Sequence, residues 1–598
     1  MNLLRIYPSK TALIPLSGTN QHKMGILSSK VMRNIFEYIR KYKFLLLIII
    51  PALLIYMLVI FPSGSYYCFE KECGYYFWGA HGRDAIWHLS IAELSFNKIP
   101  FANPAYAGGI LTGYNWLLDF FIFFLSKLGI PPIISYFKLI PTIWFVLFTT
   151  LVIHLGRKIK DTPLFVGLFL FLNYFGGSFS YLLKLYHTGS IQDSSVLLPQ
   201  PIIHSMSNLQ YAISLLFFLA ILILIKDQVI HMKRIILIGV LIFFVLGIKF
   251  YGGAISIFLV FMYLFTSLLK HPNKAGKYLS YFIITVLFIL TSIVIFYNPF
   301  VSAKTGFPFS ISPFALVHPI TEAPDQFYLE DMTNARYFLQ SKIGPRLIAI
   351  ELINLAIFLL FYFGTRFLGL LYLISLSIRK KISQFDAIVV PTIIFSVFLT
   401  VFLVQKGVWW NTIQFFFYAI FLSTIYLTTF AFDLLKKKKK FFLLLGFILI
   451  LLSIPTSYDV IWHYVNESKP VYLPKEEIEA LAFLKKQPEG VVLSPLYIKK
   501  WKKNYRSFPL NHFDDSSYVA AFSGKQLYFA EEQTLEVTGI STKSRLEKVK
   551  KKDCSILSEV DYVYELRAAD KSDNMMNKCK KKNAKKIFLN NSVIIYSL

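Results

Sequence analysis

The chain has 598 residues, of which 55% are hydrophobic and only 16% are charged. Soluble globular chains carry about 25% charged residues, and 59 Phe and 36 Tyr, mostly in long apolar runs, exceed what a water-exposed surface accommodates. These runs exclude a chain of several soluble domains and favour one membrane domain that crosses the bilayer many times. The 62 Lys and Arg against 34 Asp and Glu give a formal net charge of +28, whose placement decides its meaning.

Residues 1–42 form a basic segment ahead of the first apolar run. Because no small-residue cleavage site follows that run, we interpret it as an uncleaved signal anchor. Residues 31–42 fit either an amphipathic helix on the inner leaflet or a disordered basic tail.

Eleven segments are long and apolar enough to cross a membrane as helices. They lie near 43–62, 133–156, 162–183, 209–226, 235–250, 253–270, 278–297, 347–376, 386–405, 411–434 and 441–457. A twelfth apolar stretch, 114–130, is shorter, contains Asp119 and Lys127, and ends at a Pro-Pro pair. The fold class predicted for 43–457 is therefore a polytopic α-helical membrane domain of about 11 spans.

The short basic loops fix the orientation of these spans by the positive-inside rule. They lie at 157–160, 226–234, 270–277, 379–381 and 436–440, whereas 186–208 has no Lys or Arg and 298–346 has four. All the basic loops share one side only if 114–130 does not cross, so we predict a juxtamembrane or re-entrant helix there. The N-terminus is then cytoplasmic and the C-terminus lies outside. The basic excess therefore reflects membrane topology. Nucleic-acid binding is disfavoured, because no surface of interleaved basic and aromatic residues accompanies these charges.

Residues 458–598 are predicted to form a small extracytoplasmic α/β domain, because apolar runs shorten there and charges of both signs interleave. Pro474 followed by Lys-Glu-Glu is typical of a helix start. Strands are predicted at 491–493, 518–522 and 562–564, with a possible hairpin of 586–589 and 593–596. We find no phosphate-binding glycine loop, metal-ligand spacing or nucleophile elbow in this domain.

All four cysteines fall in segments assigned to the outside. An oxidising compartment permits disulfides, so Cys68–Cys73 and Cys554–Cys579 are reasonable pairs. Four free thiols remain the alternative.

The first outer loop holds the most informative stretch, HGRDAIWHLSIAEL, at 81–94. Asp84 and His88 are four residues apart, so on a helix they share one face. A carboxylate held at the membrane surface can act as a general base toward a hydroxyl group. On spacing alone, a helix cap explains Asp84 better than a catalytic role does.

This arrangement resembles the GT-C superfamily of polyprenyl-phosphate-sugar-dependent glycosyltransferases. The supporting features are an early acid followed by a His, the stretch 103–129 where that family has juxtamembrane helices, and LGRKIK at 155–160. The similarity is closest to the bacterial branch of protein mannosyltransferase-like and aminoarabinose transferase-like enzymes, and its motifs are confined to about 79–160. The chain lacks the His-Pro-Pro run of the mannosyltransferase-like branch. It also lacks the WWD-type motif of oligosaccharyltransferases, which disfavours en bloc oligosaccharide transfer.

The resemblance implies an inverting transfer of a single sugar from a polyprenyl-phosphate donor to a lipid, glycan or protein acceptor at the outer face. Asp84 would be the catalytic base, with His88 beside it and Asp193 as a second acid in the second outer loop. The branch is generally metal-independent, so neither a metal nor a cofactor is expected.

The leaving phosphate in such a transfer needs positive charge near the outer surface. Lys249 is the first candidate, because the Phe-Tyr-Gly-Gly run after it indicates an outer turn open to headgroups. The others are Arg346, Arg83 and Lys406. Each has an interfacial alternative in which it only snorkels to the membrane surface.

Two other functions fit the sequence. A lipid-linked sugar or polysaccharide transporter would place ionisable groups at mid-membrane. In this chain most charges lie near the ends of the predicted spans, and Arg366 and Lys138 are the exceptions. A membrane scaffold whose outer domain binds a partner is the third possibility.

Overall fold

The computed structural model describes residues 41–69, 71–191, 207–227, 230–302, 308–324, 326–341, 343–437, 439–466, 470–495, 497, 508–567, 574–579 and 584–598. These residues divide inside the first helix into two compact units, Met1–Pro51 and Ala52–Leu598. The fold and the site described below belong to the second unit. The amphipathic helix or tail predicted at 31–42 lies almost wholly outside the described residues.

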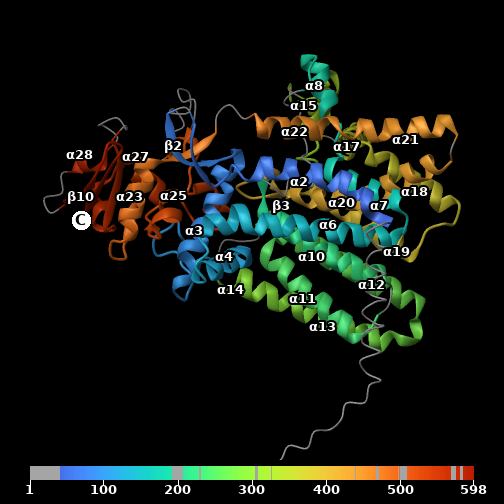
Figure 1. Cartoon of the computed structure of the whole chain (residues 1–598), viewed down its shortest axis with the longest axis horizontal. Helices are drawn as coiled ribbons and strands as arrows, with labels where there is room; N and C mark the ends of the chain where they lie inside the picture. The colour runs from blue at the N-terminus through green and yellow to red at the C-terminus, as the bar shows by residue number, and fades with distance from the viewer. Residues whose placement is uncertain are drawn as a thin grey trace, which may run out of the picture. The chain divides into compact units, whose positions relative to one another are not determined.

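Each of the eleven predicted spans is helical (Figure 1). The helices are α2 (Leu46–Ile60), α5–α6 (Pro132–Ile134 and Ile140–Ile159), α7 (Pro163–Phe175), α8 (Ser180–Thr188), α10 (Leu209–Lys226), α11 (Met232–Ile248), α12 (Phe250–Lys270), α13 (Ala275–Ser292), α17 (Pro345–Phe363), α18 (Arg366–Ile378), α19 (Gln384–Phe402), α20 (Ile413–Lys436), α21 (Lys440–Leu452) and α22 (Pro455–Val465). Among the described residues, nine helices are long and apolar enough to cross a membrane, or ten if the bent pair α7 and α8 is one span. The eleventh, α11, is one residue short of that length, at 17 residues.

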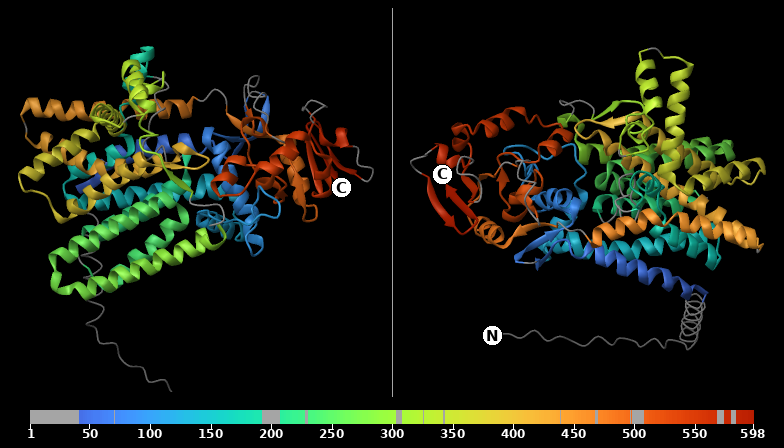
Figure 2. Two further views of the ribbon diagram at one scale, coloured as in Figure 1. Left: turned by 180° about the vertical axis from the view of Figure 1, so that it is seen from behind. Right: turned by 90° about the horizontal axis from the view of Figure 1, so that it is seen from above.

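The predicted spans differ from the helices mainly in how they end. The segment predicted at 347–376 is two helices, α17 and α18, which meet at Gly364 and Thr365. The last span runs on through α22 to Val465, eight residues beyond its predicted end. Figure 2 shows α11, α12 and α13 running side by side, and α10 packs on both α6 and α11.

The basic loops lie together at one end of the bundle. Lys160 pairs with Asp433 at 3.5 Å, and Lys270 Nζ donates to Gln384 Oε1 at 2.6 Å. Lys158 also pairs with Asp227. These contacts join the loop after α6 to those after α10 and α20, and the loop after α12 to the start of α19, as the charge pattern predicted.

A buried arginine closes the break between α7 and α8. The break leaves carbonyl groups of Gly176 and Gly177 without helical partners, which is costly inside a membrane. Arg366 Nη2 and Nη1 donate to these carbonyls at 2.8 and 3.0 Å, and its Nε donates to Thr424 Oγ1 at 2.8 Å. Gly364, at φ +57°, lets the chain pass the Gly177 carbonyl, where a Cβ atom would lie only 2.9 Å away.

The first outer loop and the C-terminal region build one sheet together. Its order is β1-β2-β5-β7, with β1 (Ser65–Phe69) and β2 (Glu72–Phe77) from the loop and β5 (Val471–Pro474) and β7 (Phe508–Pro509) from the C-terminal region. β2 runs antiparallel to β5, with Tyr75 opposite Leu473. The sequence pattern did not indicate that the two regions share a sheet.

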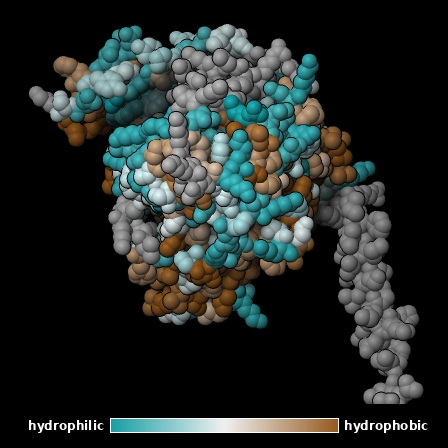
Figure 3. Space-filling model, turned by 90° about the vertical axis from the view of Figure 1, so that its left-hand side faces the viewer, coloured by the Kyte–Doolittle hydropathy of each residue, from teal (hydrophilic) through white to brown (hydrophobic). Residues whose placement is uncertain are grey.

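A second sheet belongs to the C-terminal region alone. Its order is β10-β11-β9-β6-β8, from β6 (Val491–Leu493), β8 (Gln526–Leu527), β9 (Tyr562–Leu566), β10 (Lys585–Leu589) and β11 (Val593–Ser597). Its helices are α23 (Lys475–Lys485), α24 (Leu510–Phe513), α25 (Tyr518–Ser523), α26 (Glu532–Val537), α27 (Lys543–Lys551) and α28 (Met575–Cys579). We call this C-terminal α/β region the outer domain, after its predicted location. Seen from the side of this region, much of the surface is hydrophilic (Figure 3). The chain is thus a polytopic helical membrane protein with a small α/β domain.

Most local predictions for the outer domain are confirmed. The helix after Pro474, the strands at 491–493 and 562–564 and the C-terminal hairpin are all present. The strand predicted at 518–522 is wrong, because these residues form α25. Two alanines favour the helix, and Gly524 at φ +65° ends it in the left-handed conformation. Both expected disulfides, Cys68–Cys73 and Cys554–Cys579, are formed.

A buried carboxylate lies at the centre of the outer domain. Glu477 on α23 is 2% exposed, and its Oε2 accepts hydrogen bonds from Tyr518 at 3.0 Å and Tyr564 at 2.9 Å. Burial raises the pKa of Glu477 to about 7, although the two hydroxyl donors oppose the rise. Burial likewise raises the pKa of Glu531 to about 8.

We predict that these groups make the outer domain less stable as the pH rises. A folded-state pKa above the unfolded value contributes stability at low pH that is lost as the pH rises through the folded pKa. For Glu477 the loss falls between pH 4.5 and about 7 and amounts to about 3 kcal/mol in the free energy of unfolding.

The thermal midpoint of the full chain in detergent, recorded across this pH range, measures the effect. Glu477→Gln should remove the Glu477 share of the pH dependence, whereas Glu479→Gln, at an exposed position of the same helix, should leave it intact. An unchanged pH dependence in Glu477→Gln would contradict the assignment.

Candidate functional site

The predicted acid and histidine lie on one helix, at the end of the bundle away from the basic loops (Figure 1). Asp84 opens α3 (Asp84–Leu94), which follows a 3-10 turn at Gly79–Gly82. Ser63 Oγ lies 2.7 Å from His81 Nδ1 and accepts from the Trp78 backbone at 3.0 Å, which fixes this turn. The Asp84 side chain stays partly exposed, whereas His88, one turn later, is 2% exposed. The prediction that both share one face of a helix is confirmed.

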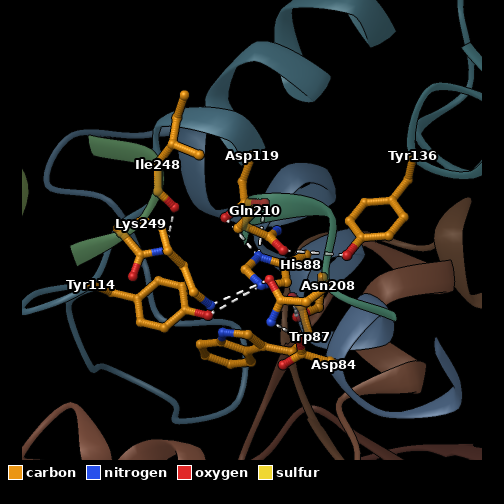
Figure 4. A network of polar contacts seen from close by, with 12 residues as sticks. Asp84, Trp87, His88, Tyr114, Asp119, Tyr136, Asn208, Gln210, Ile248 and Lys249 are labelled. Carbon is orange, nitrogen blue, oxygen red and sulfur yellow. Dashed lines mark hydrogen bonds and ion pairs between the residues drawn. The ribbon is translucent and has the colours of Figure 1, made fainter. Parts of the chain in front are cut away.

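An asparagine that the sequence analysis did not single out joins Asp84 to Lys249 (Figure 4). Asn208 caps α10, and its Oδ1 accepts from the Tyr211 backbone at 2.9 Å. Its Nδ2 donates to Asp84 Oδ2 at 3.2 Å, and Lys249 Nζ donates to its Oδ1 at 3.3 Å. Among the described residues, Asp84 and Lys249 thus meet through one amide rather than in a direct ion pair.

Lys249 stands between α11 and α12. It has an extended backbone, which ends one helix and starts the next. Asn115 Nδ2 donates to the Ile248 carbonyl at 2.8 Å and so ties this turn to the first outer loop. Only 9% of Lys249 is exposed, so its ammonium group is directed into the cluster rather than to bulk water.

A second acid, Asp119, contacts the His88 ring. Asp119 on α4 (Leu117–Lys127) is fully buried, and its carboxylate oxygens lie 2.9 and 3.1 Å from His88 Nδ1. Burial raises the pKa of Asp119, and the nearby His88 opposes the rise. On the other side of the ring, the Tyr114 hydroxyl lies 3.3 Å from Nε2. Helix α4 has only 11 residues and packs on α3 and α11, as the juxtamembrane prediction requires.

The other predicted site residues lie apart from this cluster or outside the described residues. Arg83 adjoins Asp84, but its guanidinium pairs with Asp514 at 3.3 Å and donates to Gln533 of the outer domain. Arg346 is exposed at the start of α17, and Lys406 is exposed in the loop before α20. Asp193 falls in 192–206, outside the described residues.

Three site residues were not assigned a role from the sequence: Asn208, Asp119 and Tyr114. A weak signal existed for two of them. Asn208 directly precedes an apolar run, which is typical of a helix cap, and Asp119 is an acid within an apolar stretch. Nothing in the sequence showed that either would reach α3, because these contacts span 124 and 31 residues.

No group of three or more His, Cys, Asp and Glu side chains within the described ranges could hold a metal ion.

No family model and no curated protein matches the chain. Two solved structures of the Archaeoglobus fulgidus oligosaccharyltransferase are similar to it. The form complexed with Zn and sulfate has a TM-score of 0.48 at 14% identity, over 87% of this chain and 67% of that one. The apo form has a TM-score of 0.49 at 13% identity, over 88% and 70%. Both TM-scores are below 0.5, so this similarity does not by itself establish a shared fold.

The outer domain packs directly on the helix that carries Asp84. Helix α25 lies against α3, and Ser517 Oγ donates to Ser90 Oγ at 3.0 Å, with both side chains fully buried. Gln533, which accepts from Arg83, also donates to the Gly407 carbonyl at 3.3 Å. The outer domain therefore fixes the position of Asp84 from the side opposite the membrane helices.

We predict that cysteines at 90 and 517 form a disulfide in the folded chain. Their Oγ atoms are 3.0 Å apart, and the four native cysteines are already paired. In the Ser90→Cys/Ser517→Cys variant, mild oxidation should change the mobility on a non-reducing gel and remove both free thiols.

The Ser90→Cys and Ser517→Cys single variants are the controls, and each should keep one free thiol after oxidation. A double variant that keeps two free thiols under the same treatment would contradict this packing.

Proposed function

We propose that the chain is an inverting glycosyltransferase. It transfers a single sugar from a polyprenyl-phosphate donor to a lipid, glycan or protein acceptor at the outer face of the membrane. The observation that carries the proposal is the Asp84–Asn208–Lys249 arrangement, in which a carboxylate and an ammonium group from distant segments contact the same amide.

The two charged groups suit the two ends of such a reaction. The acceptor oxygen forms a bond with the anomeric carbon while its proton passes to the Asp84 carboxylate. The bond from that carbon to the phosphate oxygen breaks, and its electron pair stays on the polyprenyl phosphate. Lys249 stabilises the negative charge that develops there, where little water competes. Because the acceptor attacks from the side of Asp84 and the polyprenyl phosphate leaves from the opposite side of the sugar, the anomeric configuration inverts.

The position of the cluster favours the outer face. The basic loops lie together at the other end of the helices, and such loops are cytoplasmic by the positive-inside rule. Residues 43–457 would then form the catalytic membrane domain and 458–598 an extracytoplasmic domain. A lipid-linked donor would enter from the outer leaflet, with its phosphate at the depth of the turn that carries Lys249.

The charges that suggested a transporter have structural roles instead. Arg366 donates to the backbone at the break between α7 and α8. Lys138 Nζ donates to the Ser63 carbonyl at 2.8 Å and to Ser65 Oγ at 2.9 Å. Both side chains hold fixed backbone segments, unlike the ion-pathway groups of a transporter.

The direct test is sugar transfer by the purified chain. The donors are undecaprenyl-phosphate mannose and undecaprenyl-phosphate aminoarabinose, radiolabelled in the sugar, and the acceptor is an extract of the cell envelope. Wild type should move label from at least one donor. Asp84→Asn should lower kcat by about 100-fold or more, because it removes the base. Lys249→Gln should lower kcat/KM by about 100-fold, because the leaving phosphate loses its cation.

Matched controls are Asp161→Asn and Lys233→Gln, which remove exposed charges near the ends of α6 and α11 that carry the basic loops. Both should keep wild-type transfer. Undiminished transfer by Asp84→Asn would refute the catalytic assignment, and transfer from neither donor by wild type would refute the proposed donor class.

A further inference from the structure

A line of hydrogen bonds leads from a buried acid to a partly exposed tyrosine. Asp119 is fully buried and His88 is 2% exposed, but Tyr114 is partly exposed. The Asp119 carboxylate lies against one nitrogen of His88, and the Tyr114 hydroxyl lies against the other. In Figure 4, Tyr114 extends toward His88 from the side of the cluster on which Lys249 also lies. Of these three residues, Tyr114 is therefore the one nearest to solvent.

The carboxylate fixes the direction of the protons along this line. Both of its oxygens lie within 3.1 Å of His88 Nδ1, so they accept a hydrogen bond from Nδ1–H. In a neutral imidazole the other nitrogen is then an acceptor, and it accepts a hydrogen bond from the Tyr114 hydroxyl. The Trp87 indole also lies beside the Tyr114 side chain, so the Tyr114 oxygen keeps one lone pair to accept a hydrogen bond from a ligand.

We infer that Tyr114 accepts a hydrogen bond from a hydroxyl or amino group of the transferred sugar, and that Asp119 is a positioning residue that acts on Tyr114 through His88. This inference rests on the proposed glycosyl transfer. It adds a contact that determines sugar specificity, because neither the base Asp84 nor the phosphate-binding Lys249 recognises the hydroxyl or amino groups of the sugar.

Helix packing alone does not account for Asp119. Helix α4 already buries Leu118 and Ile122 against the core that contains Trp116 and Phe296. Replacing both partners of a buried hydrogen bond by apolar groups of the same shape can be nearly neutral or stabilising, so attachment of α4 requires no acid. The aromatic ring of Tyr136 stacks near His88, with centroids 6.2 Å apart, which further fixes the imidazole plane.

A double-mutant cycle tests the line of contacts with whichever of the two undecaprenyl-phosphate sugars wild type uses. Tyr114→Phe should lower kcat/KM by about tenfold, the effect of one lost hydrogen bond to the sugar. Asp119→Asn should lower it by at least as much, because an amide can donate to Nδ1 and so hold the wrong tautomer. In the Tyr114→Phe background, Asp119→Asn should cost less than about threefold more, because the two act as a unit.

Asp433→Asn is the matched control. Its carboxylate pairs with Lys160 and accepts from Tyr372 near the basic loops, and its removal should leave transfer unchanged. Equal losses from Asp119→Asn in both backgrounds would show that Asp119 is only structural. A Tyr114→Phe variant as active as wild type would refute the sugar contact.

A second readout needs no substrate. In chain labelled with ¹⁵N at its 11 histidines, the His88 signals are those lost in His88→Gln. In wild type we expect Nδ1 of His88 to be protonated and Nε2 to be unprotonated. In Asp119→Asn we expect Nε2 to be protonated and Nδ1 to be unprotonated. A protonated Nε2 in wild type would overturn the positioning role, whether or not the chain transfers sugar. Failure of the proposed function is recognised separately, because wild type would then transfer neither sugar.

Discussion

The site depends on one side-chain amide, that of Asn208. As the cap of α10, Asn208 is held by its own helix through the Tyr211 backbone. The same amide donates to Asp84 from one end and accepts from Lys249 at the other. It keeps a carboxylate and an ammonium group close without letting them neutralise each other in a direct pair. Each charge therefore remains available to a ligand, and the distance between them is set by a rigid helix terminus.

The helix that carries Asp84 is held between two structures of different origin. On the membrane side, Asp119 and Asn208 reach it from α4 and α10. On the other side, Ser517 of the outer domain contacts Ser90, and β1 and β2 of the same loop complete the sheet of that domain. The outer domain is therefore part of the framework of the site. This explains why a region without recognisable catalytic motifs occupies about a quarter of the chain.

The sequence predicted what depends on local pattern and missed what depends on long-range contact. Apolar length and basic loops were enough for the helices and their common basic end, and the stretch around Asp119 was correctly predicted to be a helix too short to cross the membrane. Residues 518–522 were predicted as a strand but form a helix packed against α3. A short apolar run fits a buried strand and a buried helix equally well, so its pattern alone cannot distinguish them. Asn208 and Tyr114 carry no pattern that reveals their partners, and Arg83 adjoins Asp84 in sequence while its guanidinium is bound to the outer domain.

The anomeric configuration of the product tests the central claim most directly, because a base and a phosphate-binding cation on opposite sides of the sugar require inversion. The measurement is proton NMR of the glycoside formed by wild type, compared with the donor of known configuration. Inversion is the predicted result, with no sugar–enzyme adduct detectable by mass spectrometry. A product that retains the donor configuration would contradict the account, since retention requires a nucleophile where Asp84 acts as a base.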